Sequence, residues 1–310
     1  MPYDIVIIGG GPAAVAAGVY AARKKAKTLV VAESFGGQSI VSADIHNWIG
    51  ERNISGIALA EKLEDHIRGY KDDVEIWSDR VESVVRSASD AKLFSVTTKA
   101  GKSVEVRTVI ICSGSSRKRL SIPGEDRLDG KGVAFCSICD APLFGGKDVV
   151  VIGGGNAGLE AVIDLHPYAK RIYLVNRGAT LRGDAVTQEK IRTFPNIEFI
   201  FNATPVEILG DTFVSGMKYV DGVTGAEKTL DVQGVFIEIG SVPNSGLAKD
   251  LVEIDEIGRI KVDPRTMRTS ALGVWAAGDV TDGLYQQNNI AAGDAVRALL
   301  NAHAYLHSGK

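Results

Sequence analysis

The sequence IVIIGGG occupies residues 5–11 and returns 144 positions later as VVVIGGG at residues 149–155. Each copy is a run of β-branched apolar residues that ends in three glycines. A stretch rich in helix formers and a second apolar run follow each copy, at residues 13–22 and 28–32 and again at 157–165 and 171–175. Strand, glycine turn, helix and strand make the βαβ unit of a doubly wound parallel sheet. Two copies predict two dinucleotide-sized modules.

The remaining segments predict how these modules are arranged. Alternating apolar runs at residues 74–85, 93–98 and 104–111 indicate antiparallel β insertions in the first module. Small, flexible residues at 113–116 and 240–244 suit two crossings between domains. We therefore expect an α/β fold of two Rossmann-like domains, the second inserted into the first. The first comprises residues 1–115 and 245–310, and the second comprises residues 116–244.

Composition excludes several classes of protein. The 310 residues are 24% charged and 45% hydrophobic, as in a folded chain of about two domains. Thirty-five Lys and Arg against 38 Asp and Glu give a net charge of −3, which argues against nucleic acid as a partner. The sequence shows neither a basic leader nor about 18 consecutive apolar residues, so we expect a cytoplasmic protein without membrane partners.

The first glycine motif, Gly9-x-Gly11-x-x-Ala14, has the spacing of a dinucleotide site. The first glycine permits the tight turn, the second lets the backbone approach a pyrophosphate, and a small third residue lets the helix pack on the strand. Glu33, 22 residues after Gly11, is placed to accept ribose hydroxyls, although Ala32 competes for that register.

The second motif carries all three glycines, Gly153, Gly155 and Gly158. Its ribose position falls near Asn176, which is neither the acid expected for NAD nor a cation. Arg177 and Arg182 follow, and an arginine there can bind a 2′-phosphate. The alternative is that both arginines are ordinary surface charges.

Cys136-Ser137-Ile138-Cys139-Asp140 is the motif that carries chemistry. Two intervening residues place both sulfurs on one turn, close enough for a reversible disulfide, and Asp140 could move the proton. Half a zinc site and two inert thiols are the alternatives. The chain offers no second C-x-x-C and no histidine pair at metal spacing, so we expect no metal. Cys112, in an apolar run, is expected to be a buried small hydrophobe.

Taken together, these motifs resemble the low-molecular-weight thioredoxin reductases, including the flavoprotein module of alkyl hydroperoxide reductase. The resemblance spans nearly the whole chain. It is carried by GGGPAA at 9–14, GGQ at 36–38, CSICD at 136–140, GGGN at 153–156 and AAGDV at 276–280.

The resemblance implies FAD in the discontinuous domain, a nicotinamide cofactor in the inserted domain, and a homodimer. FAD contacts are expected from Gly9, Gly11, Pro12, Ala13, Gly37, Gln38, Asn47, Gly278, Asp279 and Gln287. Further cofactor contacts are expected from Glu33, Gly36, Val81, Gly114, Gln286 and Asn288 in the first domain and from Gly153, Gly155, Asn156, Ala157, Gly158, Asn176, Arg177 and Arg182 in the second.

The resemblance also implies roles for the redox motif. Cys139 would lie nearest the flavin, Cys136 would exchange with a partner disulfide, and Asp140 would act as acid and base. Electrons would pass from nicotinamide to flavin to the cysteines, with one domain rotating against the other about residues 113–117 and 240–244. The expected partner is a separate thioredoxin-like or glutaredoxin-like dithiol protein, because the thioredoxin-fold domain of the peroxide-reductase flavoprotein is not found here.

Two departures bear on the coenzyme. NADPH-specific members have His-Arg-Arg followed after three residues by Arg, whereas this chain reads Asn176-Arg177-Gly178 with Arg182 later. Two of three arginines remain, which weakens the preference for NADPH over NADH; we expect NADPH, with NADH possible. The family's Arg-Gln-Ala is Gln286-Gln287-Asn288 here, which removes a cation.

Other functions compatible with the motifs are a flavin-dependent dithiol oxidase that uses O₂, an NADH-dependent reductase that serves a peroxiredoxin system through a separate dithiol protein, a ferredoxin or flavodoxin reductase, and a flavin-binding sensor. The intact second glycine motif argues against the oxidase. The C-x-x-C-D argues against the last two.

Overall fold

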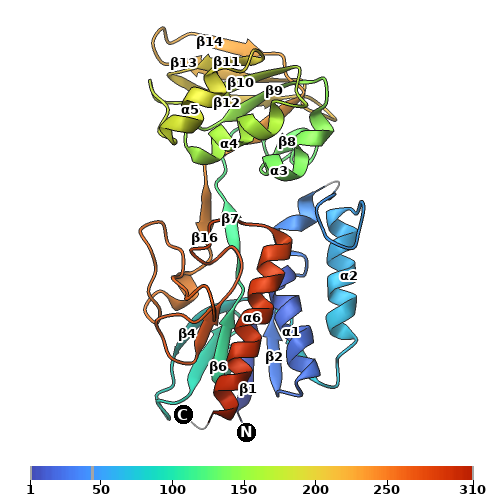
Figure 1. Cartoon of the computed structure of the whole chain (residues 1–310), viewed down its shortest axis with the longest axis vertical. Helices are drawn as coiled ribbons and strands as arrows, with labels where there is room; N and C mark the ends of the chain where they lie inside the picture. The colour runs from blue at the N-terminus through green and yellow to red at the C-terminus, as the bar shows by residue number, and fades with distance from the viewer. Residues whose placement is uncertain (1, 43–44, 309–310) are drawn as a thin grey trace. The chain divides into compact units, whose positions relative to one another are not determined.

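The structure is a computed structural model that describes residues 2–42 and 45–308 (Figure 1). The described chain forms two compact units. One contains the chain up to Ser42, Trp48–Ser116 and the chain from Val242 onward, and the other contains chiefly Arg117–Ser241. Each is built on a mainly parallel sheet. The predicted α/β class, with one doubly wound unit inserted into another, is confirmed.

A seven-stranded sheet forms the first unit, with strand order β3-β2-β1-β6-β5-β4 and β17 beside β6. Its strands are β1 (Tyr3–Ile8), β2 (Thr28–Val31), β3 (Val74–Trp77), β4 (Val81–Arg86), β5 (Phe94–Thr98), β6 (Ser103–Ile111) and β17 (Val274–Ala276). All pairs are parallel except β4 with β5 and β5 with β6.

The prediction that residues 74–85 belong to an antiparallel insertion is therefore wrong for their first part. β3 pairs in parallel with β2, and only β4 belongs to the antiparallel meander. After β3 the backbone N–H of Asp79 donates to the carbonyls of both Ala32 and Trp77, each 3.1 Å away, and the chain then turns into β4.

Helices cover one face of this sheet. They are α1 (Pro12–Arg23), α2 (Gly56–Arg68) and α6 (Asn288–His307), with the short 3₁₀ turn η1 (Gly37–Val41) before α2. A second 3₁₀ turn, η3 (Gly246–Ala248), packs Ala248 into the core of the other face. Alanines on α1 and α6 share one core with Ile5 and Ile7 of β1, and Figure 1 shows the two helices side by side. Val6 and Ile8 point to the other face, against the β4–β5 meander. Alternation along β1 thus fills two cores.

The second unit has a parallel sheet of order β11-β10-β9-β15-β8 and a separate antiparallel sheet, β12-β13-β14. Its strands are β8 (Val133–Ala134), β9 (Asp148–Ile152), β10 (Arg171–Val175), β11 (Ile197–Ile200), β12 (Ala203–Leu209), β13 (Gly216–Asp221), β14 (Glu227–Leu230) and β15 (Gly234–Ile237). Its helices are α3 (Ser137–Asp140), η2 (Ala141–Phe144), α4 (Asn156–Leu165) and α5 (Ala185–Arg192). Val149 and Val151 of β9 face α4, and Val150 and Ile152 face the antiparallel sheet.

Two strands carry the chain between the units. β7 (Ser115–Arg117) pairs with β16 (Ser241–Pro243) as a separate two-stranded sheet. Backbone hydrogen bonds from Lys118 to Gly240 and from Asn244 to Gly114, each 3.0 Å, extend this pairing. The chain therefore leaves and re-enters the first unit along one ribbon.

Candidate redox and dinucleotide sites

Each glycine turn begins at a position that can accommodate only glycine. Gly9 has φ +129°, and a Cβ there would lie 2.2 Å from the carbonyl oxygen of Cys112. Gly153 has φ +134°, and its Cβ would lie 2.3 Å from the carbonyl oxygen of Glu238. Both the positive φ and the contact exclude a side chain. The two turns are thus built against the chain that follows the neighbouring parallel strand, β6 in the first unit and β15 in the second.

The second glycines face open space. A Cβ on Gly11 would find its nearest atom 3.8 Å away, and a Cβ on Gly155 would find none within 4 Å. These glycines are the N-caps of α1 and α4, and neither helix has a side-chain cap. By contrast, Ser55 and Asp184 cap α2 and α5 through their side chains. Backbone N–H groups at an uncapped helix start suit an anionic pyrophosphate, so both turns fit a dinucleotide.

The third motif position packs the helix on its strand. A Cβ on Gly158 would lie 1.9 Å from the carbonyl oxygen of Gly153. The equivalent Ala14 is fully buried, Pro12 at the first turn of α1 is buried, and Ala13 is 5% exposed. Helix and strand therefore approach slightly more closely in the second unit.

Several predicted flavin residues meet around the start of α1. The backbone N–H of Gly36 donates to the Gly10 carbonyl at 2.9 Å, and a Cβ on Gly37 would lie 3.2 Å from the Gly11 Cα. A Cβ on Gly278 would lie 3.5 Å from that of Ala13 and 3.1 Å from that of Ala291 in α6. The described structure thus brings the first glycine turn, the 36–38 segment and the start of α6 together.

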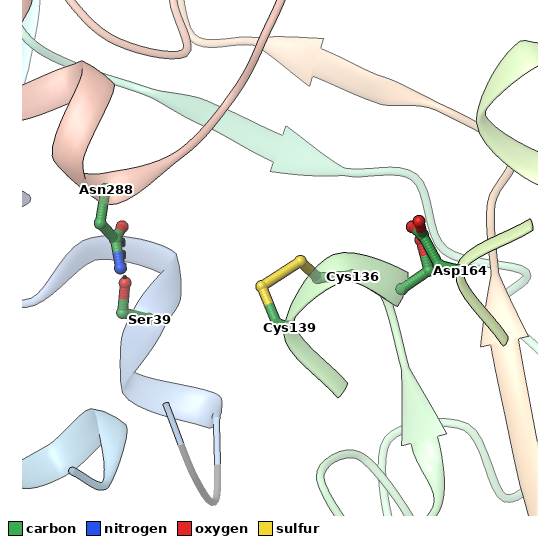
Figure 2. The surroundings of a disulfide bond; sticks show 6 residues. Ser39, Cys136, Cys139, Asp164 and Asn288 are labelled. Carbon is green, nitrogen blue, oxygen red and sulfur yellow. Dashed lines mark hydrogen bonds between the residues drawn. A yellow bond between two sulfur atoms is a disulfide. The ribbon is translucent and has the colours of Figure 1, made fainter. Parts of the chain in front are cut away.

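Polar side chains tie these segments to one another. The Gln38 amide donates to the carbonyl and the hydroxyl of Ser115. Ser39 Oγ donates to Asn288 Oδ1 at 3.0 Å. Figure 2 shows these two side chains next to each other. α6 begins after Gln287 without a side-chain cap, as α1 and α4 do after Gly11 and Gly155.

The other predicted residues of the first unit are more dispersed. Ala32 is buried after β2 and Glu33 is exposed, so the acid of this pair keeps the accessible position. Val81 begins β4, two residues after the Asp79 that hydrogen-bonds Ala32. The exposed Gln286 donates to the Asp279 carbonyl at 3.5 Å, and Gly114, with φ +66°, lies beside β7.

Asn47 is the exception among the flavin candidates. Its short segment, residues 45–47, groups with the second unit. A flavin contact for Asn47 therefore rests on the resemblance alone.

The nicotinamide candidates form one loop over the second glycine turn. Asn176 is buried and its amide donates to the carbonyls of Gly178 and Thr180, at 2.9 and 2.8 Å. The backbone N–H of Arg182 donates to the Gly154 carbonyl at 2.7 Å. Asn176 thus shapes the loop, and Arg177 and Arg182 carry the exposed cations.

Two further candidates start α4. Asn156 Oδ1 accepts the backbone N–H of Asp184 at 2.7 Å, and Ala157 is exposed beside it. Asn156 therefore joins the glycine turn to the end of the arginine loop.

Cys136 and Cys139 form a disulfide with their Cα atoms 5.3 Å apart (Figure 2). The pair spans α3, where the N–H groups of Cys139 and Asp140 donate to the Cys136 carbonyl at 3.2 and 3.0 Å. Both cysteines are half-buried. The prediction that one turn brings the two sulfurs together is confirmed.

Asp140, directly after the pair, holds its proton more tightly than an ordinary carboxyl. Burial raises the pKa of Asp140 to about 6; the charge of Asp129 reinforces the rise and that of Arg117 opposes it. Near neutral pH this carboxyl can therefore both give and take a proton, as an acid and base for thiol chemistry requires.

Sequence reasoning missed two carboxyls behind the redox turn. Ser137 Oγ donates to Asp164 Oδ2 of α4 at 2.7 Å, and the Ser137 backbone N–H donates to the carboxyl of Glu238. Burial raises the pKa of Glu238 to about 8, and the charges of Asp164 and Asp140 act in the same direction. A signal was present, since Glu238 interrupts the apolar run that contains β15.

Cys112 is buried and free, and burial raises the pKa of its thiol far above the ordinary range. The expectation of a buried small hydrophobe is confirmed. Within residues 2–42 and 45–308, no three His, Cys, Asp or Glu side chains are grouped as metal ligands would be. No helix in this described part of the chain is long and apolar enough to span a membrane.

Comparison with known proteins places these features in a family. A family model described as pyridine nucleotide-disulphide oxidoreductase matches residues 3–295. Thioredoxin reductase from Streptococcus pyogenes has a similar structure, with TM-score 0.91, 33% identity, and coverage of 99% of this chain and 98% of that one. Thioredoxin reductase from Giardia duodenalis gives TM-score 0.90 and 32% identity, with 98% of each chain covered.

Curated relatives are similar in sequence but longer. One alkyl hydroperoxide reductase subunit, from Staphylococcus epidermidis, is 41% identical over 305 residues, which is 98% of this chain and 59% of the relative. A Bacillus subtilis protein named NADH dehydrogenase is 40% identical over 306 residues, with the same coverage. The chain thus spans about three-fifths of the length of these relatives.

Proposed function

Because the chain belongs to the pyridine nucleotide-disulphide oxidoreductase family, we propose that it is an FAD-dependent NAD(P)H:disulfide reductase. Its substrate would be the disulfide of a thioredoxin-like or glutaredoxin-like protein. The observation that carries the proposal is the Cys136–Cys139 disulfide, followed directly by Asp140 with its raised pKa. The same unit contains the second glycine turn, after which α4 begins without a side-chain cap.

The first unit fits FAD. Gly11 and the start of α1 would receive the pyrophosphate, Glu33 the ribose, and Gly37, Gln38, Gly278, Asp279 and Gln287 the rest of the cofactor. Bound FAD would supply acceptance of a hydride from nicotinamide and delivery of two electrons to a disulfide. Gly155 and the start of α4 would receive the pyrophosphate of the nicotinamide coenzyme.

The protein's own groups then handle thiols and protons. Opening the Cys136–Cys139 disulfide adds two electrons and breaks the S–S bond. The sulfur released as thiolate can take the proton that Asp140 holds below about pH 6. Cys136 then attacks the partner disulfide as a thiolate, and Cys139 displaces the partner from the mixed disulfide. The partner leaves as a dithiol, and the Cys136–Cys139 disulfide is restored.

An anaerobic titration tests this function. The flavin absorbance of oxidised protein is followed during separate additions of NADPH and NADH, and turnover is then measured with a bacterial thioredoxin as acceptor. Cys136→Ser and Cys139→Ser should each abolish thioredoxin reduction, while the buried Cys112→Ser should leave it near the wild-type rate. Reduction of thioredoxin by Cys136→Ser at the wild-type rate would rule the function out.

For the coenzyme we propose NADPH, bound through Arg177 and Arg182. Both side chains are exposed, and the Arg182 backbone is tied to the glycine turn. Alanine at either position should lower kcat/KM for NADPH about tenfold, about 1.4 kcal/mol, and leave NADH unchanged. Arg192→Ala on α5 is a matched control. Equal wild-type kcat/KM values for the two coenzymes would overturn this preference.

We also infer a homodimer, as the resemblance to thioredoxin reductases implies. Light scattering of the purified flavoprotein should give twice the chain mass of 32.9 kDa. A monomeric mass at micromolar concentration would contradict this.

A further inference from the structure

Ser137, between the two redox cysteines, is held from two sides. It is 8% exposed; its hydroxyl donates to Asp164 on α4, and its backbone N–H donates to Glu238 at the end of β15. Figure 2 shows Asp164 beside the turn that bears the disulfide. Three elements, α3, α4 and β15, therefore meet at one residue of the C-x-x-C motif.

Glu238 has an unusual environment for a carboxyl. Its Oε1 is buried and has no hydrogen-bond partner among the described residues. A neutral carboxyl is far less costly to bury in this way than a carboxylate. Asp140 from α3 and Asp164 from α4 disfavour a charge on Glu238, while Arg117 from β7 and the Ser137 N–H favour it. Asp129 disfavours a charge on Asp140 in turn, because its own negative charge raises the pKa of Asp140.

Reduction of the cysteine pair changes the charge at this place. The disulfide takes up two electrons, its S–S bond breaks, and the two sulfurs become a thiol and a thiolate when one proton binds, or two thiols when two protons bind. A thiolate adds a negative charge to a turn that Asp140 directly follows and that Ser137 joins to Asp164 and Glu238. A neighbouring group that gains a proton at the same time offsets that charge.

We propose that Glu238 is the proton store of the redox pair and that Glu238 and Asp164 are its positioning residues, holding Ser137 from behind. Where Glu238 is ionised while the disulfide is formed, it binds a proton from solvent when the pair is reduced to thiol and thiolate, and it returns the proton to solvent when the disulfide forms again. This role rests on the proposed disulfide reductase function.

The first test measures proton uptake without nicotinamide or partner. Full-length flavoprotein is equilibrated with dithiothreitol redox buffers between pH 6 and 10, the thiols are alkylated after quenching, and the peptide with Cys136 and Cys139 is quantified by mass spectrometry. Because the pKa of Glu238 is about 8 with the disulfide formed, the extra uptake should begin above that pH. Above that pH, each added pH unit should lower the equilibrium constant for reduction by a factor up to tenfold larger in wild type than in Glu238→Gln. For a two-electron reaction this difference is about 30 mV per pH unit.

Two further variants make the result specific. Glu198→Gln removes an exposed carboxylate of β11 and should keep the wild-type pH dependence. Asp164→Asn keeps an oxygen for the Ser137 hydroxyl but removes a charge that raises the pKa of Glu238, so the steep region should begin at lower pH. Identical pH dependence of wild type and Glu238→Gln would overturn the proposal.

A second measurement uses the wild type alone and serves if Glu238→Gln does not fold. A reduced-minus-oxidised infrared spectrum at pH 9 should show a new C=O band of a protonated buried carboxyl, and a spectrum without it would overturn the proposal. Neither readout uses NAD(P)H or a partner protein. Failure of the proton store is therefore distinct from failure of the reductase function, which the nicotinamide titration tests.

Discussion

The two glycine turns share one backbone device and differ in the residue behind it. Gly9 packs against the carbonyl of Cys112, and Gly153 packs against that of Glu238. Cys112 is an inert buried thiol, whereas the side chain of Glu238 reaches the redox turn. In both units the backbone carbonyl of this residue packs against the glycine turn. Its side chain is therefore not fixed by the turn, and in the second unit that side chain is a carboxyl that reaches the redox motif.

The largest expected effect comes from adding a side chain to the first glycine of either turn. Gly9→Ala and Gly153→Ala each place a Cβ within 2.3 Å of a carbonyl oxygen at positive φ, so each should cost more than about 3 kcal/mol of unfolding free energy. Denaturant unfolding measures this cost, and absorbance of the purified protein measures retained flavin. Gly9→Ala should lose flavin. If Gly153→Ala lost flavin and Gly9→Ala retained it, the assignment of the two cofactors would be reversed.

A smaller effect comes from the buried carboxyl of Asp140 in the second unit, and it depends on pH. With its pKa raised to about 6, Asp140 is bound to its proton more tightly in the folded protein than in the unfolded chain. The free energy of unfolding therefore falls as pH rises from about 4 to about 6 and stays lower above that window.

Asp140→Asn removes this penalty. The oxidised variant should gain about 2 kcal/mol over wild type at pH 7.5 and little at pH 4, allowing for the partial exposure of the carboxyl. Urea unfolding at both pH values checks it, with the exposed Asp231→Asn as control. An equal gain at both pH values would exclude a raised pKa as the cause.

The third prediction separates binding from folding within each turn. Gly11 and Gly155 have φ of −77° and −93° and open space around them, so alanine should change stability by less than about 0.5 kcal/mol. The added methyl would occupy the approach to a pyrophosphate. Gly11→Ala should weaken FAD binding, and Gly155→Ala nicotinamide binding, each about tenfold, about 1.4 kcal/mol. Calorimetric titration of each cofactor measures this, and two unchanged affinities would remove the pyrophosphate from both turns.

The smallest effect shows that glycine is dispensable away from the turns. Gly293 is exposed within α6, and a Cβ there would meet nothing within 4 Å. Gly293→Ala should stabilise the protein by about 0.5–1 kcal/mol, because alanine loses less backbone entropy in a helix. Thermal unfolding should show a higher Tm with unchanged flavin content, and a lower Tm would indicate a contact to this helix face.

The fold could be predicted from sequence because its signals are local. The run at residues 5–8 and its repeat at 149–152 are too β-branched and too uniformly apolar to be anything but buried parallel strands. The glycines directly after them determine the turn. β3 was placed wrongly because its partner, β2, lies more than 40 residues earlier, and short apolar runs do not reveal which strand they pair with.

The site was predictable where one motif contains all of its parts. Cys136, Cys139 and Asp140 are neighbours in sequence, so their meeting followed from spacing alone. The contact of Glu238 with Ser137 joins residues 101 positions apart and depends on the order of β8, β15 and β9 in the sheet. The buried position of the Asn176 side chain likewise depends on the carbonyls of Gly178 and Thr180, which face its amide only once the loop has folded.

The paired strands β7 and β16 have a consequence for how such a chain could arise. Ser113 Oγ donates to the Asn244 carbonyl at 2.8 Å, so the two points where the host fold is interrupted are neighbours. A cassette whose ends meet can enter or leave a gene in one event without separating β1 from β6. Replacing residues 117–241 by a short turn should accordingly leave the first unit as a self-contained domain that can be produced and isolated.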